Sequence, residues 1–254
     1  MLSNLRREPV TGPTAATPRE ALANTEWLSS VRGATIDLLE KHALLHRMPP
    51  GSILFEQAES PAFALLLVSG SVELLAVRGT DETLVELVRA PDLLLPAAVL
   101  NNQPYLLRAR VRDEALLVMI QKEAFREAVS SDHDLCLAVL ACQSVQFRRQ
   151  VKRAKNLHLR SAEERVGCYL LSLTEGKAGG TPVKLPLEKH LIASQLGITR
   201  ETFSRTLSAV SRHGLRVEGD LVYLDDIAAA RARFQLDPLI DGYEPIVPLH
   251  TKRA

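Results

Sequence analysis

The stretch LGITRETFSRTLSAVSRHG, residues 196–214, decides the fold of the C-terminal third of the chain. Gly197 favours a tight turn, and Thr199 is a typical N-cap for a following helix. Side chains three and four positions apart share one face of a helix. One face of this helix therefore carries the polar residues Arg200, Glu201, Ser204 and Arg205. The opposite face carries the apolar residues Phe203, Leu207 and Val210.

The neighbouring segments complete a winged helix-turn-helix. Residues 161–176 predict a helix that begins with a capping box, in which Ser161 is followed three residues later by Glu164. Residues 188–197 predict the short helix before the turn, and residues 215–225 predict a hairpin around Gly219 and Asp220. The sequence thus predicts a winged helix-turn-helix over residues 159–236.

A helix-turn-helix places its second helix in the major groove of double-stranded DNA. There an arginine can bridge O6 and N7 of guanine, and a glutamate can accept a hydrogen bond from N4 of cytosine. A simpler interpretation is a salt bridge from Glu201 to Arg205 on an ordinary surface helix. We expect DNA recognition instead, because the turn, both helices and the wing are all predicted in the order of a winged helix-turn-helix. The predicted DNA-binding residues are Lys189, Thr199, Arg200, Glu201, Ser204, Arg205 and Arg212.

A long helix is predicted before this domain, over residues 131–158. From 135 to 158 the chain has no proline or glycine. A mostly apolar set of residues, beginning at Leu137 and Leu140, recurs there at alternating spacings of three and four. That spacing is typical of a coiled-coil seam. We expect a homodimer, with packing onto the protein's own sheet as the alternative. The predicted dimer seam is Leu137, Leu140, Ser144, Phe147, Val151 and Ala154.

Residues 25–130 form the predicted sensor domain. Between residues 49 and 120, short apolar runs alternate with turn signals about every ten residues, as in a β-sandwich or barrel. Residues 1–24 predict a disordered tail, and residues 237–254 a C-terminal tail. The predicted fold class is therefore α+β: an N-terminal β-roll (a double-stranded jelly roll), a long dimerisation helix and a C-terminal winged helix-turn-helix.

The charge of the chain is divided unevenly. Residues 1–145 hold 13 Lys and Arg against 18 Asp and Glu, whereas residues 146–236 hold 16 against 9. A basic half suits a polyanionic partner, although a solvated basic face would give the same balance. No apolar run is long enough to span a bilayer, and the first 20 residues lack the apolar core of a signal peptide. We therefore expect a cytoplasmic protein with no membrane partner.

Over about residues 26–236 the chain resembles the CRP/FNR family of bacterial transcription regulators. The segment PPGSILFEQAESPAFALLLVSGSVELL, residues 49–75, resembles the start of the family's cyclic-nucleotide-binding-type β-roll. Residues 185–226 resemble its helix-turn-helix and wing. The resemblance implies a homodimer that binds DNA and works with RNA polymerase.

The resemblance also assigns the reading face. In the family an R-E-x-x-x-R face reads DNA, which corresponds here to Arg200, Glu201 and Arg205. The E-x-x-S-R pattern of the FNR branch corresponds to Glu201, Ser204 and Arg205. That branch reads TTGAT half-sites in an inverted repeat, so we expect TTGAT-like half-sites about one helical turn, roughly 34 Å, apart.

The sensor departs from the family pattern. Cyclic-nucleotide binders carry a Gly-Glu pair for the ribose and a later Arg-Ser or Arg-Ala pair for the phosphate. Here Leu95 and Pro96 take the first positions, and Leu106 and Leu107 the second. A phosphate that faces leucine would be buried without a partner, which argues against cAMP. An iron–sulfur cluster with four cysteine ligands is excluded, because the chain has three cysteines.

What remains is an apolar region, which we expect to be either a filled core or an effector pocket. The candidate pocket residues are Leu94, Leu95, Val99, Leu106 and Leu107. Haem is one alternative, as in relatives that sense carbon monoxide or nitric oxide. Its axial ligand would be His42, His46 or His133, unless these are surface residues. Cys142 is a candidate for oxidation, with a buried, inert thiol as the alternative.

An enzyme is not expected. A cupin metal site needs clustered histidines, and residues 50–130 contain none. No G-x-S-x-G, P-loop or G-x-G-x-x-G motif occurs. The remaining rival is a ligand-free β-roll module that acts through a protein partner. The leading interpretation is a homodimeric DNA-binding transcription regulator, controlled by an effector other than cAMP.

Overall fold

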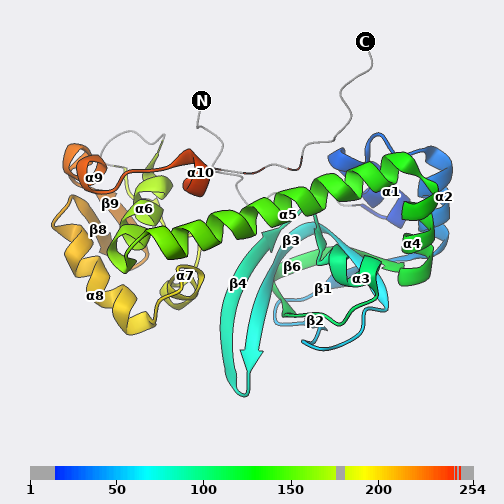
Figure 1. Ribbon diagram of the computed structural model, residues 1–254, viewed down its shortest axis with the longest axis horizontal. Helices are drawn as coiled ribbons and strands as arrows, with labels where there is room; N and C mark the ends of the chain where they lie inside the picture. Colours follow the sequence, from blue (N-terminus) through cyan, green and yellow to red (C-terminus); the bar gives the residue numbers. More distant parts are fainter. Residues whose placement is uncertain (1–14, 176–180, 243, 245, 247–254) are drawn as a thin grey trace, which may run out of the picture. The chain divides into compact units, whose positions relative to one another are not determined.

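The computed structural model describes residues 15–175, 181–242, 244 and 246, and the chain divides into two compact units (Figure 1). The N-terminal unit lies within residues 8–146 and takes in Ile246. The C-terminal unit lies within residues 147–244. Helix α5 (His133–Leu159) contributes residues to both units.

A six-stranded antiparallel sheet forms the centre of the N-terminal unit. Four strands run in the order β1-β6-β3-β4, while β2 pairs with β6 and β5 pairs with β3. The two longest strands, β3 and β6, pair along most of their length. The strands are β1 (Ala43–Met48), β2 (Ile53–Phe55), β3 (Phe63–Arg78), β4 (Asp81–Arg89), β5 (Asp92–Leu94) and β6 (Arg108–Gln121).

Gly70 lies where the pairing of β3 with β6 becomes irregular. The register shifts three times between Leu67 and Val72. Gly70 has a φ of +86°, and a Cβ atom there would lie 2.2 Å from the carbonyl oxygen of Glu114. Only glycine combines that backbone conformation with so close an approach. The irregular stretch separates the half of β3 that pairs with β5 from the half that pairs with β4.

Two cores follow from the alternation of side chains along these strands. The interior core draws on both halves of the sheet, as expected for a roll: Leu65, Leu67, Val72, Leu74, Leu94, Ala109, Val111 and Leu117. The outer core joins the other face of the first half to the helices: Leu66, Val118, Ile120, Trp27, Leu39, Phe125 and Leu135. This architecture confirms the predicted β-roll.

The helices α1, α2 and α4 cluster around the first half of α5, as Figure 1 shows. The predicted disordered tail over residues 1–24 is wrong for its last part, because residues 18–23 form α1. Thr17 caps this helix by accepting a hydrogen bond from the backbone of Glu20 at 3.2 Å, and Leu22 is buried. Residues 1–14 lie outside the described part of the chain. The helices of this unit before α5 are α1 (Pro18–Ala23), the 3-10 helix η1 (Glu26–Leu28), α2 (Gly33–Lys41), α3 (Pro96–Asn101) and α4 (Lys122–Ser131).

The C-terminal unit is a winged helix, which confirms the predicted fold. Its small sheet has the order β7-β9-β8, and α6 and α7 pack against α8. The capping box of Ser161 and Glu164 is formed. None of the helices in the described residues is long and apolar enough to cross a membrane. The elements are α6 (Ala162–Thr174), β7 (Val183–Lys184), α7 (Lys189–Gln195), α8 (Arg200–Ser211), β8 (Leu215–Glu218), β9 (Leu221–Leu224), α9 (Ile227–Arg233) and α10 (Pro238–Asp241).

The long helix α5 begins at a buried carboxylate. One oxygen of Asp132 accepts hydrogen bonds from the backbone N–H groups of Asp134 at 2.9 Å and Leu135 at 3.4 Å. The other oxygen accepts from Arg32 at 3.2 Å and from the hydroxyl of Thr35. Burial alone would raise the pKa of Asp132, but these hydrogen bonds outweigh it and lower the pKa.

Replacing Gly70 by Ala should destabilise the roll strongly, because the new Cβ would meet Glu114 as well as strain the backbone. Gly51→Ala is the matched control, since Gly51 has a φ of +87° with open space around it. We expect a loss of about 1–2 kcal/mol in unfolding free energy for the control, from strain alone. Gly70→Ala should lose at least about 2 kcal/mol more. Equal losses in urea unfolding would contradict this account of the bend.

Replacing Asp132 by Ala should lower the unfolding free energy by about 1–3 kcal/mol at pH 7, since a cap and a buried acceptor are lost. The pKa of Asp132 is lowered in the folded state, so its charge-dependent stabilisation is complete above pH ~4 and declines below it. Urea unfolding should thus give a smaller difference at pH 3 than at pH 7. Asp132→Asn, which keeps a capping acceptor, should fall between the two proteins. A difference that does not change with pH would contradict the role of the charge.

Candidate nucleic-acid interface

The turn between α7 and α8 is closed by backbone hydrogen bonds. The N–H of Gly197 donates to the carbonyl of Ser194, and the N–H of Ile198 donates to that of Ala193, both at 3.0 Å. Gly197 has a φ of +66°, and a Cβ there would lie 2.6 Å from a methyl carbon of Leu157 on α5. Glycine is therefore required twice, for the conformation and for the packing of the turn against α5.

Helix α8 is oriented by its cap and by its buried row. The hydroxyl of Thr199 accepts a hydrogen bond from the N–H of Thr202 at 3.2 Å, as predicted for an N-cap. Phe203 and Val210 are buried, as the sequence predicts. Thr206 is the third buried residue of the row, whereas Leu207 is half-buried. The predicted inward position of Leu207 is thus only partly correct, because Thr206 lies closer to the centre of that face.

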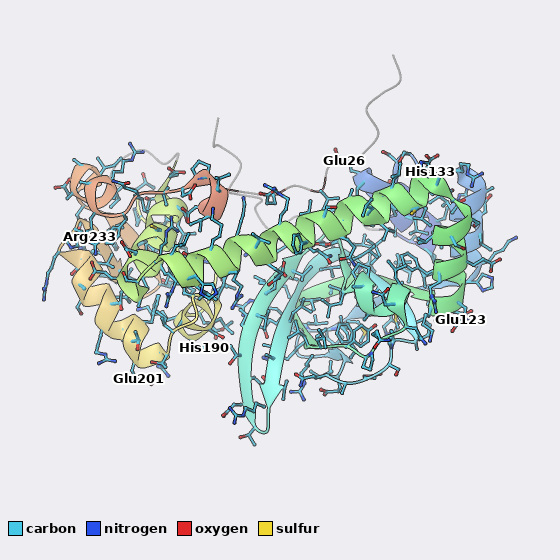
Figure 2. All side chains as sticks on the ribbon, viewed as in Figure 1. Glu26, Glu123, His133, His190, Glu201 and Arg233 are labelled. Atoms are coloured by element: carbon cyan, nitrogen blue, oxygen red, sulfur yellow. The ribbon has the colours of Figure 1, made fainter. Side chains whose placement is uncertain are left out.

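The opposite face of α8 is exposed. Arg200, Glu201, Ser204 and Arg205 are all exposed there. Figure 2 shows Glu201 at the beginning of this helix. Among the described residues, Arg205 donates at 3.5 Å to the hydroxyl of Thr202 and forms no ion pair with Glu201. The salt bridge of the simpler interpretation is therefore not formed, and these groups face solvent.

Glu201 is suited to accept hydrogen bonds at neutral pH. Hydrogen bonds from its own backbone N–H and from the hydroxyl of Thr199 lower its pKa, and the charges of Arg200 and Arg205 lower it further. The side chain is thus a carboxylate under ordinary conditions. A carboxylate between two guanidinium groups presents an acceptor and two donors along one exposed face.

Three basic residues of the predicted DNA-binding set lie at two ends of the helix pair. Lys189 at the start of α7 and Arg200 at the start of α8 line one open hollow, together with the wing turn at Gly219 and Asp220. Arg212 lies at the other end of α8, past its last residue. Twelve helical residues separate these ends by roughly 18 Å. The structure therefore brings Lys189 and Arg200 together and leaves Arg212 apart.

The wing is more acidic than the helices. Its turn carries Glu218 and Asp220, both exposed. Arg216 forms ion pairs with Glu218 and with Asp225, the latter at 2.8 Å, and lies 4.4 Å from the ring centre of Tyr223. These carboxylates neutralise the cation of the wing. The strongest positive groups of the interface are therefore on α7 and α8.

The predicted dimer seam forms an exposed apolar stripe along α5. Leu140, Phe147 and Val151 are 51%, 69% and 42% exposed. Ser144 and Ala154 are exposed as well, while Leu137 is half-buried. An apolar row of this length is unusual on a surface that faces only water. The alternative, in which the seam packs onto the protein's own sheet, is wrong for these residues.

The predicted effector pocket is not formed, because its residues belong to different environments. Val99 lies in the outer core, whereas Leu94 lies in the interior core with Leu95 and Leu107 at its edge. Leu106 is 84% exposed. Val99 and Leu106 therefore cannot line the same cavity as Leu94, Leu95 and Leu107. The prediction of one pocket is therefore wrong.

The structure also bears on the two positions expected to correspond to the Gly-Glu pair. Leu95 has a φ of +44°, a left-handed conformation that favours glycine. Pro96 begins α3 and has no N–H to donate to an anion. A cradle of backbone amides cannot be completed at this position.

Three arginines on β6 form ion pairs with carboxylates and do not point into the interior core. Arg108 pairs with Glu56 at 2.7 Å, and Arg110 pairs with Glu73 at 2.9 Å. Arg112 also pairs with Glu73, at 3.2 Å. Ala109 and Val111, which alternate with these arginines, face the interior core. No cation of this strand segment thus points into the roll.

The remaining candidate sensing residues are separate from the interior core. His42, His46 and His133 are all exposed. Cys142 is fully buried in the outer core, on the opposite side of α5 from the stripe, and its sulfur lies 3.2 Å from a carboxylate oxygen of Asp92. Cys142 is therefore buried, as in the alternative given for it.

Sequence reasoning missed the residues after α9. Asp241 and Glu244 form ion pairs with Arg160 and Arg148 on or next to α5. The available signal was the spacing of Arg148, Lys152 and Lys155, which share one face of the helix at positions four and seven apart.

Comparison with known proteins agrees with both units. Residues 164–230 match the family described as the Crp-like helix-turn-helix domain, and residues 45–132 match the cyclic nucleotide-binding domain. The nitrogen fixation regulation protein FixK of Azorhizobium caulinodans is 28% identical over 157 residues. That match covers 59% of this chain and 61% of the relative, so it spans less than two thirds of FixK.

Solved structures of similar fold cover most of the chain. FixK2 from Bradyrhizobium japonicum superimposes with a TM-score of 0.60 and 18% identity, over 77% of this chain and 98% of that one. A variant of CooA from Carboxydothermus hydrogenoformans gives a TM-score of 0.65 and 18% identity, over 87% and 96%. These likenesses show the fold. The two family matches in this order, together with the similarity to FixK, show that the chain belongs to the CRP/FNR family, whose members are transcription regulators and not enzymes.

Proposed function

We propose that the protein is a homodimeric, sequence-specific DNA-binding regulator of transcription. It reads TTGAT-like inverted repeats through α8 and responds to an effector other than cAMP. The observation that carries this proposal is the exposed face of α8, on which two arginines flank an ionised glutamate. Because the structure shows no ion pair between these three groups, they are available to donate and accept hydrogen bonds at base edges.

The reading face fits the edges of base pairs in the major groove. Arg205 and Arg200 can each donate two hydrogen bonds to guanine, and Glu201 can accept one from cytosine. Ser204 adds a small donor and acceptor between them. Each well-placed pair contributes about 1–3 kcal/mol of discrimination against the wrong base. Lys189, Thr199 and Arg212 lie at the ends of the helices and are proposed to hold the phosphates.

The exposed stripe on α5 supports a dimer. A second copy of the helix could cover Leu140, Phe147 and Val151 at once, in the manner of a coiled coil. A two-fold dimer presents two copies of α8 to two half-sites about one helical turn apart, which is why an inverted repeat is the proposed target. RNA polymerase is the proposed protein partner, on family resemblance alone.

Several contacts argue against a cyclic nucleotide in the roll. The ribose would meet Leu95 and Pro96, where no carboxylate is available, and the cyclic phosphate would meet Leu106 and Leu107, which carry no charge. The arginines of β6 are engaged by Glu56 and Glu73 on the other face of the strand. Moving a phosphate into an apolar interior without a cation costs several kcal/mol. The effector of this protein therefore has a different chemistry.

The two alternatives have less support. A haem sensor needs an axial ligand that points into a cavity, and the candidate histidines lie on the surface. A module that acts only through a protein partner would not need the exposed charges of α8. Removing those charges distinguishes this last alternative from DNA recognition.

Arg205→Ala should weaken binding to a duplex with a TTGAT inverted repeat by about tenfold or more, because a bidentate contact to a base is lost. Fluorescence anisotropy at fixed salt measures the affinity. Arg126→Ala is the matched control, since Arg126 is an exposed arginine on α4 of the N-terminal unit. It should leave the affinity unchanged. If Arg205→Ala binds as tightly as the control while remaining a folded dimer, DNA recognition by α8 is wrong.

Phe147→Glu should convert the dimer to monomer at micromolar concentration, because a charge would be buried at the centre of the seam. Light scattering after size-exclusion chromatography measures the mass. Leu159→Glu is the matched control, since Leu159 is 68% exposed on the same helix but lies off the stripe. The control should stay dimeric. A dimeric Phe147→Glu protein would show that the stripe is not the interface.

A further inference from the structure

The junction between α5 and α6 consists of two residues. Helix α5 ends at Leu159, and Ser161 already caps α6. The residue between them, Arg160, has a side chain that is only 9% exposed. A flexible joint between two helices would not usually bury a charged side chain. The buried guanidinium of Arg160 therefore needs a partner that compensates its charge.

That partner is Asp241 on α10, far away in the sequence. Both terminal nitrogens of Arg160 donate to the carboxylate of Asp241, each at 2.7 Å. The same guanidinium also donates to the carbonyl of Gln235 at 3.2 Å and to the side chain of Asn156 at 3.2 Å. The carbonyl of Arg160 accepts from Arg165 on α6 at 2.8 Å. One residue of the junction is thus held from α5, from α6 and from the C-terminal segment.

A second set of contacts holds the same segment to α5. The carboxylate of Glu244 accepts two hydrogen bonds from Arg148, each at 2.9 Å. Lys152 pairs with Glu244 and donates to the carbonyl of Gly242 at 2.8 Å. Hydrogen bonds from Arg148 and then Lys152 lower the pKa of Glu244 to about 2, against the effect of burial. Glu244 is therefore charged under all ordinary conditions.

The segment is also fixed where it leaves the winged helix. Phe234, which follows α9, is buried, and its ring packs onto α6 at Gly167, where a Cβ atom would lie only 2.3 Å from the ring. Asp237 caps α10 by accepting from the N–H of Leu239 at 2.8 Å. The segment thus begins at α6 and ends on α5. It lies beyond residue 230, where the match to the Crp-like helix-turn-helix domain ends.

We propose that residues 237–242 and Glu244 form an ionic strap that locks the junction between α5 and α6. The lock makes the second half of α5 and the winged helix move as one body. In this arrangement the bidentate pair of Arg160 with Asp241 restrains the junction itself. The pairs of Glu244 with Arg148 and Lys152 anchor the end of the strap about two to three helical turns earlier on α5.

Hydrogen–deuterium exchange of the full-length protein, followed by mass spectrometry, tests the strap. Asp241→Asn keeps the size of the side chain but removes its charge. We expect exchange of the amides around residues 159–166 to become about tenfold faster, because local opening no longer has to break the charged pair. Glu244→Gln should accelerate the same amides by a smaller factor. Glu114→Gln, which removes an exposed ion pair with Arg47 on the roll, is the control and should not change them.

Two results would overturn the proposal. Exchange at the junction that equals the wild type in Asp241→Asn would show that the pair restrains nothing. Exchange that rises equally across the whole C-terminal unit would show that Asp241 supports the fold in general and not the junction. The measurement needs no DNA, so failure of the strap and failure of the proposed DNA recognition are separate outcomes.

Discussion

The structure depends on how one helix, α5, divides its surface. A helix of 27 residues is about 40 Å long, which is more than one small core can cover. On its first half, Leu135, Val139 and Cys142 are buried against the roll and its helices. A second face carries the exposed apolar stripe, and a third carries the cations that hold the C-terminal strap. A residue on one of these faces cannot contribute to another, because its side chain points in only one direction. Helix α5 therefore contributes separate faces to the core of the N-terminal unit, to the proposed dimer interface and to the strap of the C-terminal unit.

The winged helix could be predicted because its signals are local. A turn at Gly197, a cap at Thr199 and a capping box at Ser161 each depend on residues within four positions. The positions of the candidate pocket residues could not be predicted. A correct prediction needs the face of the sheet on which each leucine lies, and the irregular pairing of β3 with β6 hides this from the sequence. The contacts of the strap could not be predicted for a related reason. Asp241 lies 81 positions from Arg160, and no local pattern reports a contact over that distance. The helix over residues 18–23 was missed although Thr17 and Pro18 are typical residues for a helix start.

The ion pairs of β6 explain why its arginines give no phosphate site, although they follow closely on the positions expected to bind the cyclic phosphate. Glu73 is 5% exposed, and a buried carboxylate without a cation would be strongly unfavourable. Arg110 and Arg112 both pair with it, so moving either arginine inward would leave Glu73 undercompensated. The roll has thus placed its charges on its outer face and apolar side chains inside. A ligand for such an interior would have to be apolar, or the interior would serve as a core alone.

The position of the strap has a consequence for how the DNA-binding unit could be switched. A ligand can shift a conformational equilibrium only through an element that has two arrangements of similar free energy. If the strap locks the junction between α5 and α6, that joint does not supply the two arrangements. The stripe on α5 is then the better candidate, because its apolar row is interrupted by Ser144 and Ala154, which offer little contact area. A seam whose large residues are interrupted by small ones packs less tightly than one of leucines, so two registers of the paired helices differ less in free energy. A shift of register would be carried directly to α8, since Gly197 rests on Leu157 of the same helix.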